Sequence, residues 1–260
     1  MATWKLTLAY DGSRFAGWAR QPALRTVQGV LEDAVGRILG GAGVRLTVAG
    51  RTDAGVHATA QVASFETDPE PPDRFAHRIN AVLPRDVSVL VAEPAPEGFD
   101  ARRWARSRSY RYRILTTPER DPFEEGRALW WPYPLDRAGI DECAAAIVGA
   151  HDFTAFTPTD TEHVRFERVV ARAAWEDESP NRLAFAIQAD AFMRNMIRVL
   201  VGTMLEVGAG RRSLDDFRSL LEGAPRERAG ETAPAHGLYF TGVSYGDGPA
   251  YVHAPYRDTF

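Results

Sequence analysis

The segment AGRTDAGVHA, residues 49–58, holds a single carboxylate, Asp53, between glycines at positions 50 and 55. Arg51 lies two residues before this carboxylate and His57 four residues after it. Because glycine lets a backbone or a ligand approach closely, one interpretation is that Asp53 lies at a strand end where a substrate can reach it. The alternative is a simple turn, since Asp and Gly are both common turn residues. His57 has two interpretations, a packing or hydrogen-bonding residue and a catalytic base, and the pattern favours the first.

A second segment combines arginines with aromatic side chains. Residues 102–113, RRWARSRSYRYR, contain no acid and interleave the arginines with Trp104, Tyr110 and Tyr112. The arginines are Arg102, Arg103, Arg106, Arg108, Arg111 and Arg113. Arginine binds phosphate and aromatic faces stack on unpaired bases, so the segment is typical of a nucleic-acid surface. A solvated edge strand with its charges facing water would have the same composition.

Several other chemistries lack their motifs in this sequence. There is no GxxxxGK[ST] phosphate loop, and the nearest dinucleotide-like segment, residues 208–210, follows an expected helix and not a strand. No HExxH motif occurs, and the single cysteine, Cys143, excludes both an internal disulfide and a multi-cysteine zinc site. A Ser-His-Asp triad is not excluded, but no GxSxG elbow supports it. These absences argue against a nucleotide cofactor and against a hydrolytic zinc site, and we expect no metal.

The composition is that of a soluble globular protein. The chain has 260 residues, of which 45% are hydrophobic and 25% charged, and its net charge is −4. The apolar runs are too short to cross a membrane and no secretory signal is evident, so we expect a cytoplasmic protein. Lys5 is the only lysine, which leaves arginine as the phosphate-binding side chain, although genome base composition produces the same bias.

Hydrophobic periodicity predicts mixed secondary structure. Residues 3–10 alternate as a half-buried strand does, and residues 27–39 have the spacing of a helix that Thr26 caps. Residues 192–205 form the most regular helical stripe, with Arg198 on its flank. Further strands are expected at residues 44–48, 61–66, 87–92, 109–116, 166–175, 182–188 and 238–245, and further helices at 75–83 and 135–148. Residues 222–236 are rich in Gly, Pro and charge and indicate a surface loop.

These elements predict an α+β protein with a largely antiparallel sheet, and not a doubly wound parallel one. We divide it into an N-terminal subdomain, residues 1–104, which carries Asp53, and a C-terminal subdomain, residues 105–260.

Six blocks of the sequence, spread over most of its length, resemble the tRNA pseudouridine synthase A (TruA) family. They are LAYDGSRFAGWARQP at 8–22, TVQGVLEDAV at 26–35, AGRTDAGVHATAQVASF at 49–65, FDARRWARSRSYRYRI at 99–114, AFMRNMIRVLVGTMLEVG at 191–208 and APAHGLYF at 233–240. The resemblance implies two ferredoxin-like or RRM-like subdomains that share a central antiparallel sheet, with an active-site cleft between them. It also implies a homodimer that isomerises uridines 38, 39 and 40 in the tRNA anticodon stem-loop without a cofactor.

By the same resemblance, Asp53 is the catalytic aspartate. Arg51 would help to displace the target nucleotide, Tyr110 would stack on the uracil and Arg198 would pair with the aspartate. We expect the substrate-binding residues to be Arg51, Tyr110, His57, Arg20, Arg106 and Arg108. The sequence departs from the family at Ala19, where a glutamine usually follows Gly-Trp, so Arg20 or Gln21 would make any contact of that glutamine.

Two alternatives remain open at this point. One is an RNA-binding module that uses the same arginines and aromatic residues without catalysis. A polyanion-binding surface has no use for the Asp53 carboxylate, which counts against it. The other is a pseudouridine synthase that acts on different tRNA positions or on other RNA.

Overall fold

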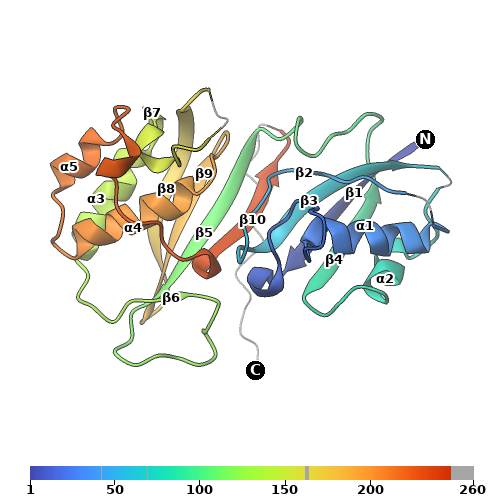
Figure 1. Ribbon diagram of the computed structural model, residues 1–260, viewed down its shortest axis with the longest axis horizontal. Coiled ribbons are helices and arrows are strands. Elements are labelled where there is room, and N and C mark those ends of the chain that lie inside the picture. The colour runs from blue at the N-terminus through green and yellow to red at the C-terminus, as the bar shows by residue number, and fades with distance from the viewer. Residues whose placement is uncertain (42, 69, 162–163, 247–260) are drawn as a thin grey trace. The chain divides into compact units, whose positions relative to one another are not determined.

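A computed structural model describes residues 1–41, 43–68, 70–161 and 164–246 of the chain (Figure 1). The chain divides into two compact units. Unit 1 comprises Met1–Arg108 and the chain from Tyr239 onward, and unit 2 comprises Ser109–Leu238. The sequence-based division, 1–104 and 105–260, assigns the last strand to the second unit. The difference arises because Tyr239 and Phe240 pair with His57 and Ala58 of unit 1.

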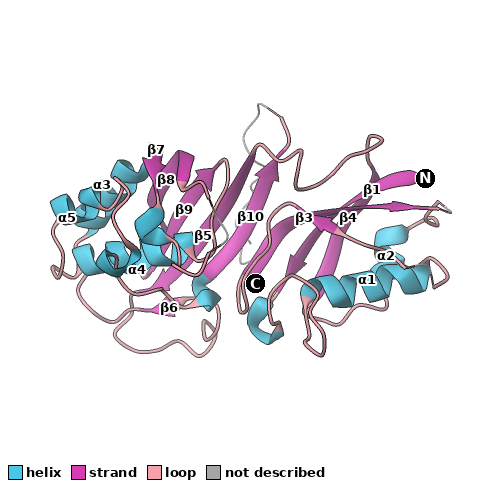
Figure 2. Ribbon diagram, turned by 45° about the horizontal axis from the view of Figure 1, so that its top comes forward, coloured by secondary structure: helices cyan, strands magenta, loops and turns pink. Residues whose placement is uncertain are grey.

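Unit 1 is built on the strands β4, β1, β3 and β10 in that order. Their bounds are β1 Ala2–Tyr10, β2 Thr47–Val48, β3 His57–Thr67, β4 Val87–Pro94 and β10 Leu238–Ser244, with helices α1 Val27–Ile38 and α2 Phe75–Asn80 and the 3₁₀ turn η1 Gly12–Arg14. β1 is antiparallel to β3 and β4, β2 is antiparallel to β3, and β10 is parallel to β3. Figures 1 and 2 show α1 and α2 side by side against this sheet.

The alternation in β1 has the consequence expected from the sequence. Trp4, Leu6, Leu8 and Tyr10 are all buried, while the residues between them are half-buried. Helix α1 begins after Thr26, whose Oγ1 accepts a hydrogen bond from the backbone N–H of Gly29 as an N-cap does. Strand β2 is shorter than residues 44–48, and β3 begins at His57, four residues before the expected start at residue 61.

Unit 2 contains the strands β5, β9, β8 and β7 in that order, with β6 beside β5. Their bounds are β5 Ser107–Leu115, β6 Leu129–Trp130, β7 Gly149–Asp152, β8 Glu167–Ser179 and β9 Arg182–Ala189; the helices are α3 Arg137–Ile147, α4 Met196–Gly208 and α5 Leu214–Ser219, and the 3₁₀ turns are η2 Thr154–Phe156, η3 Arg226–Arg228 and η4 Ala235–Gly237. β8 and β9 form the expected antiparallel hairpin, closed by the pair Ser179 and Arg182. Figure 1 shows α3, α4 and α5 gathered on this unit.

Helix α4 starts later than its apolar stripe. The stripe begins at Phe192, but Asn195 has φ +60°, the left-handed conformation, and the helix begins at Met196. Met193 is buried although it lies outside the helix, so it contributes to the stripe without helical geometry.

The α+β class expected from the sequence is confirmed.

Candidate active site and the loops that position it

Asp53 lies in the loop between β2 and β3, at the start of a reverse turn. The backbone N–H of Val56 donates to the Asp53 carbonyl oxygen at 3.2 Å, and Gly55 has φ +79°. A positive φ at this position is strained for a residue with a side chain, which explains the glycine. The turn ends where β3 begins, at His57, so the Asp53 side chain, which is half-buried, lies just before the strand.

A second loop, residues 11–18, packs directly against the backbone of this turn. Gly17 has φ +93°, and a Cβ at this position would lie 3.0 Å from the carbonyl oxygen of Thr52 and 3.3 Å from the nitrogen of Ala54. The next residue, Trp18, donates its backbone N–H to the same Thr52 oxygen at 3.0 Å. A Cβ at Gly12 would overlap the carbonyl group of Val56. The two sequence blocks YDGSRFAGW and GRTDAGVHA therefore form one structure around Asp53.

Two hydrogen bonds from buried strand residues anchor the residues that precede Asp53. The Tyr10 hydroxyl lies 2.8 Å from Thr52 Oγ1, and Gln61 Nε2 donates to the Gly50 carbonyl oxygen at 2.8 Å. Burial raises the pKa of Tyr10 to about 12, so its hydroxyl stays protonated over the physiological pH range. These strand residues hold the loop at Gly50 and at Thr52, on the N-terminal side of Asp53.

His57 is buried, with 3% of its surface exposed, and supports the second loop. Its Nδ1 accepts a hydrogen bond from the backbone N–H of Gly12 at 3.0 Å, and its ring stacks on Tyr239 with the centroids 4.6 Å apart. This bond requires an unprotonated Nδ1, so the Asp11 carboxylate oxygen 3.3 Å away does not form a salt bridge with it in this arrangement. The geometry gives His57 a supporting role, and its contact with substrate stays a prediction.

Arg108 braces the same region through backbone oxygens. Its Nε donates to the Ala49 carbonyl at 3.1 Å, and its Nη1 and Nη2 donate to the carbonyls of Ala105 and Arg102 at 3.2 and 2.9 Å. Arg20 instead forms ion pairs with two carboxylates, since its Nη1 lies 3.2 Å from Glu32 and 3.1 Å from Asp33. Both guanidinium groups thus have protein partners, and their expected contacts with RNA stay predictions.

The arginines of residues 102–113 fall into different environments. Arg111 lies 2.5 Å from Glu176 and 3.0 Å from Glu178, and Arg113 lies 2.8 Å from Glu178 and 3.1 Å from Glu124. By contrast Arg102, Arg103 and Arg106 are exposed and have no side-chain partner within the described residues. Trp104 beside them is 43% exposed and packs edge-on against Phe99. Only part of the segment therefore offers free positive charge.

Tyr110 and Arg198 belong to unit 2, whereas Arg51, Asp53 and the other predicted site residues belong to unit 1. The Tyr110 ring is buried and lies edge-on to Phe192, with the centroids 5.0 Å apart. Arg198, on α4, donates from Nε to the Ala233 carbonyl at 2.7 Å and from Nη1 to Asn195 Oδ1 at 3.0 Å. Arg51 is exposed and makes no side-chain hydrogen bond or ion pair with the described residues.

Sequence reasoning did not assign a role to Gly17, Thr52, Gln61, Asn195 or Ala233. The role of Gly17 could have been predicted from the sequence. It lies in a block that resembles the family, and glycine next to tryptophan implies a close backbone approach. The contacts of the others link residues distant in the sequence or depend on backbone conformation, which a pattern of residue types does not encode.

The described residues contain no group of three or more His, Cys, Asp or Glu side chains able to hold a metal ion. Burial raises the pKa of the Cys143 thiol to about 12, which keeps it protonated and unreactive at neutral pH. Across the same residues, no helix has the length and apolar character that crossing a membrane requires.

Comparison with known proteins gives the family. The tRNA pseudouridine synthase family matches residues 7–102 and 143–246. The tRNA pseudouridine synthase A proteins of Halalkalibacterium halodurans and Frankia casuarinae are 42% and 44% identical to this chain, over 90% and 94% of its length and 89% and 90% of theirs. A chain of a solved archaeal box H/ACA sRNP Nop10–Cbf5 complex aligns with 78% of this chain at 14% identity. The alignment covers 44% of the solved chain, with a TM-score of 0.32. The chain therefore belongs to the tRNA pseudouridine synthase family of isomerases.

Proposed function

We propose that this isomerase converts uridine to pseudouridine at positions 38, 39 and 40 of the tRNA anticodon stem-loop. In this reaction the bond from uracil N1 to ribose C1′ breaks, the base turns, and C5 bonds to C1′. C5 loses a proton and N1 gains one, so the product is an isomer and no co-substrate is consumed. The protein must therefore extrude, hold and turn a base, which side chains can do without a cofactor.

The observation that carries this proposal is the position of Asp53 in a turn that a second loop holds. A carboxylate can act as a nucleophile, or as a base and electrostatic partner of a cationic sugar, without a metal. Its efficiency depends on a fixed position, and the contacts of Thr52 and Val56 with residues 12–18 supply that position. We assign catalysis to Asp53 on these grounds together with the family resemblance.

Arg198 and Tyr110 complete the proposed site. An arginine that pairs with the Asp53 carboxylate would favour its charged form and orient it. The Arg198 guanidinium suits this role because Ala233 and Asn195 fix its direction. The Tyr110 ring, held by Phe192, offers a flat face on which uracil can stack.

We assign base displacement to Arg51 and backbone binding to the arginines near Trp104. Arg51 is exposed next to the catalytic turn, and an inserted side chain can offset the few kcal/mol that unstacking a base costs. Arg102, Arg103 and Arg106 are exposed without acidic partners among the described residues, so they can neutralise phosphates.

The resemblance further supports a homodimer that acts on cytoplasmic tRNA, with one subunit's basic surface holding the RNA that the other modifies. Size-exclusion chromatography with light scattering tests this part directly. A protein that is monomeric at assay concentration and fully active would remove the dimer from the proposal.

The function itself is tested with purified protein and unmodified tRNA transcripts. Pseudouridine-specific chemical labelling maps the product, and transcripts with cytidine at position 38, 39 or 40 test each site. We expect modification only at uridines in these three positions. Product elsewhere in the tRNA would overturn the proposed specificity, and no product with a folded protein that binds tRNA would overturn the catalytic assignment.

A further inference from the structure

The segment that the sequence indicates to be a surface loop, residues 222–236, is packed against helix α4 through Gly230, Glu231 and Ala233. We call residues 223–237 the strap. Gly230, Ala233 and Gly237 of the strap are buried, although its other residues are exposed or half-buried. The strap includes η3 and η4 and precedes β10. Its buried positions indicate that it has a fixed place in unit 2.

The middle of the strap packs closely against α4 through the backbone of Gly230 and Glu231. The Gly230 N–H donates to Thr203 Oγ1 at 3.0 Å, and Thr203 Oγ1 in turn donates to the Val199 carbonyl at 2.7 Å. A Cβ at Gly202 would overlap the carbonyl oxygen of Glu231, and one at Gly230 would lie 2.6 Å from a carboxylate oxygen of Glu206. The contact as it stands therefore requires glycine at position 202, where the opposing atom is backbone, and a hydroxyl at position 203.

Beyond this contact, the strap reaches Arg198. The Ala233 N–H donates to the Arg198 carbonyl at 3.1 Å, and the Ala233 carbonyl accepts from Arg198 Nε at 2.7 Å. The Tyr112 hydroxyl holds the following residue by donating to the Pro234 carbonyl at 2.8 Å. The N–H and the carbonyl of Ala233 thus both hydrogen-bond to Arg198. Because the carbonyl binds Nε, the position of the strap sets the direction of the guanidinium.

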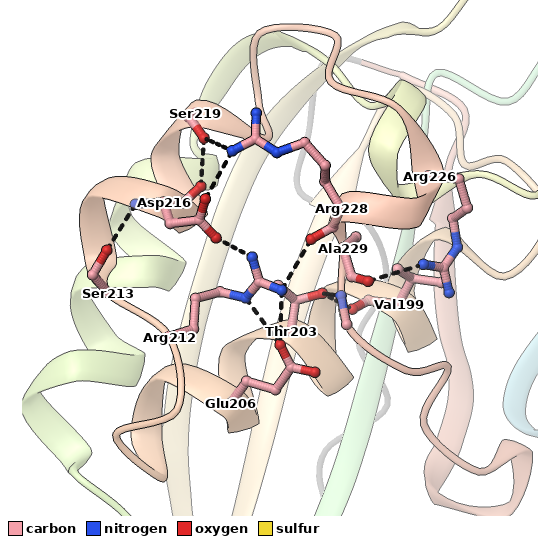
Figure 3. A network of polar contacts seen from close by, with 11 residues as sticks. Val199, Thr203, Glu206, Arg212, Ser213, Asp216, Ser219, Arg226, Arg228 and Ala229 are labelled. Carbon is pink, nitrogen blue, oxygen red and sulfur yellow. Dashed lines mark hydrogen bonds and ion pairs between the residues drawn. The ribbon is translucent and has the colours of Figure 1, made fainter.

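The other end of the strap is held by ion pairs (Figure 3). Arg212 binds Glu206 of α4 through Nε at 2.9 Å, contacts Asp216 of α5, and donates from Nη2 to the Arg228 carbonyl of the strap at 2.9 Å. Arg228 also pairs with Asp216 at 2.8 Å. The Arg212 side chain is 14% exposed, so solvent screens these contacts less than it screens a surface pair.

We infer that the strap is a positioning device for Arg198, with Thr203 and Arg212 as positioning residues for the isomerisation. The inference rests on the proposed catalytic role of Arg198. Nε and Nη1 of Arg198 bind the Ala233 carbonyl and Asn195 Oδ1, and because the guanidinium is planar these two bonds fix the direction of the whole group. A displaced strap would leave the charge of Arg198 in place but change its aim, so turnover falls more than tRNA binding.

The test compares hydroxyl-removing and hydroxyl-keeping variants of one residue. Thr203→Val keeps the volume and removes both hydrogen bonds, whereas Thr203→Ser keeps the oxygen. Thr7→Val is the matched control, because Thr7 on β1 is half-buried and makes no side-chain hydrogen bond with the described part of the chain. The readouts are the single-turnover rate of pseudouridine formation, the tRNA dissociation constant, and the thermal midpoint.

We expect Thr203→Val to lower the single-turnover rate about 10- to 100-fold, as a misplacement of about 1 Å does, with tRNA affinity changed less than about twofold. Thr203→Ser should restore most of the rate, and Thr7→Val should match the parent protein. Equal losses of rate and affinity in Thr203→Val, or an unchanged rate, would overturn the inference. If Thr203→Val does not fold, Arg212→Gln provides the same comparison from the peripheral end of the strap.

A double-mutant cycle separates this inference from the proposed role of Arg198. If the strap acts through Arg198, the Arg198→Ala/Thr203→Val protein is no slower than Arg198→Ala alone. If the rate losses of the two single variants instead multiply in the double variant, the strap inference is overturned while the proposed role of Arg198 stands. Near-normal turnover of Arg198→Ala would instead overturn the proposed role of Arg198, and the strap inference with it.

Discussion

Replacing Gly17 by alanine tests whether residues 11–18 position the catalytic turn. Two separate effects act at this glycine, a φ of +93° and a Cβ only 3.0 Å from the Thr52 carbonyl oxygen. A side chain in sparsely populated backbone conformations costs about 1–3 kcal/mol. The close contact adds to this cost and pushes the backbone of residues 52–54 away, because the contacting atoms are main-chain atoms and not a flexible side chain.

Other glycines of unit 1 separate the two effects. Gly40 has φ +77°, and no atom lies within 4 Å of the place that a Cβ would take, so Gly40→Ala introduces strain without contact. Gly43 has neither feature, and Gly43→Ala should be neutral or stabilise by about 0.4–1 kcal/mol. Gly12→Ala introduces contact with Val56 at an ordinary φ. Together with Gly17→Ala, these variants form a complete set of strain and contact combinations.

The assay pairs chemical denaturation with single-turnover pseudouridine formation at saturating enzyme. We expect Gly17→Ala and Gly40→Ala both to lower the free energy of unfolding, the first by more. Only the contact variants, Gly17→Ala and Gly12→Ala, should slow the reaction, by about 100-fold if the carboxylate moves by about 1 Å. Should Gly17→Ala turn over as fast as Gly40→Ala while tRNA binding is unchanged, residues 11–18 do not position Asp53.

Three further predictions concern single side chains. Asp53→Asn should keep the fold and tRNA binding and lower turnover by about 1,000-fold or more, which single-turnover kinetics and a filter-binding assay measure together. Tyr110→Phe keeps the ring against Phe192, so tRNA binding should persist; complete loss of binding would contradict a stacking role. Arg102→Gln should lower the salt dependence of tRNA affinity by about one phosphate contact. Arg111→Gln removes one of the two arginines that pair with Glu176, the other being Arg172, and should mainly lower the thermal midpoint.

The sequence predicts the local elements well because their signals are local. The alternation of β1 and the Thr26 cap of α1 depend only on neighbouring residues, and both are found in the structure. The start of α4 is less predictable, since a left-handed Asn195 interrupts an apolar stripe that continues on both sides of it. A hydrophobic pattern reports which face is buried and not where the backbone changes conformation.

Around the candidate site, the contacts that the sequence does not predict are those between distant segments. The turn at Asp53 follows from Gly55 and could be predicted, but its attachment to Gly17 joins segments more than thirty positions apart. The polar composition of the strap indicates a surface loop, whereas its fixed position depends on Thr203 and Arg212 of a preceding segment. Composition records the side chains of a segment, and these contacts are made largely by its backbone.

The arginines of residues 102–113 show that a count of charges in the sequence does not predict how much positive charge is available for RNA binding. Their number in the sequence suggests a strong basic surface, yet Glu176, Glu178 and Glu124 neutralise Arg111 and Arg113 inside unit 2. Arg108 is used to brace backbone, which leaves the exposed arginines near Trp104 as the local positive charge. For a chain with net charge −4, affinity for a polyanion then depends on where unpaired arginines lie and not on how many there are. The salt dependence of tRNA binding counts phosphate contacts, so it reports on the unpaired arginines and is insensitive to those already matched by carboxylates.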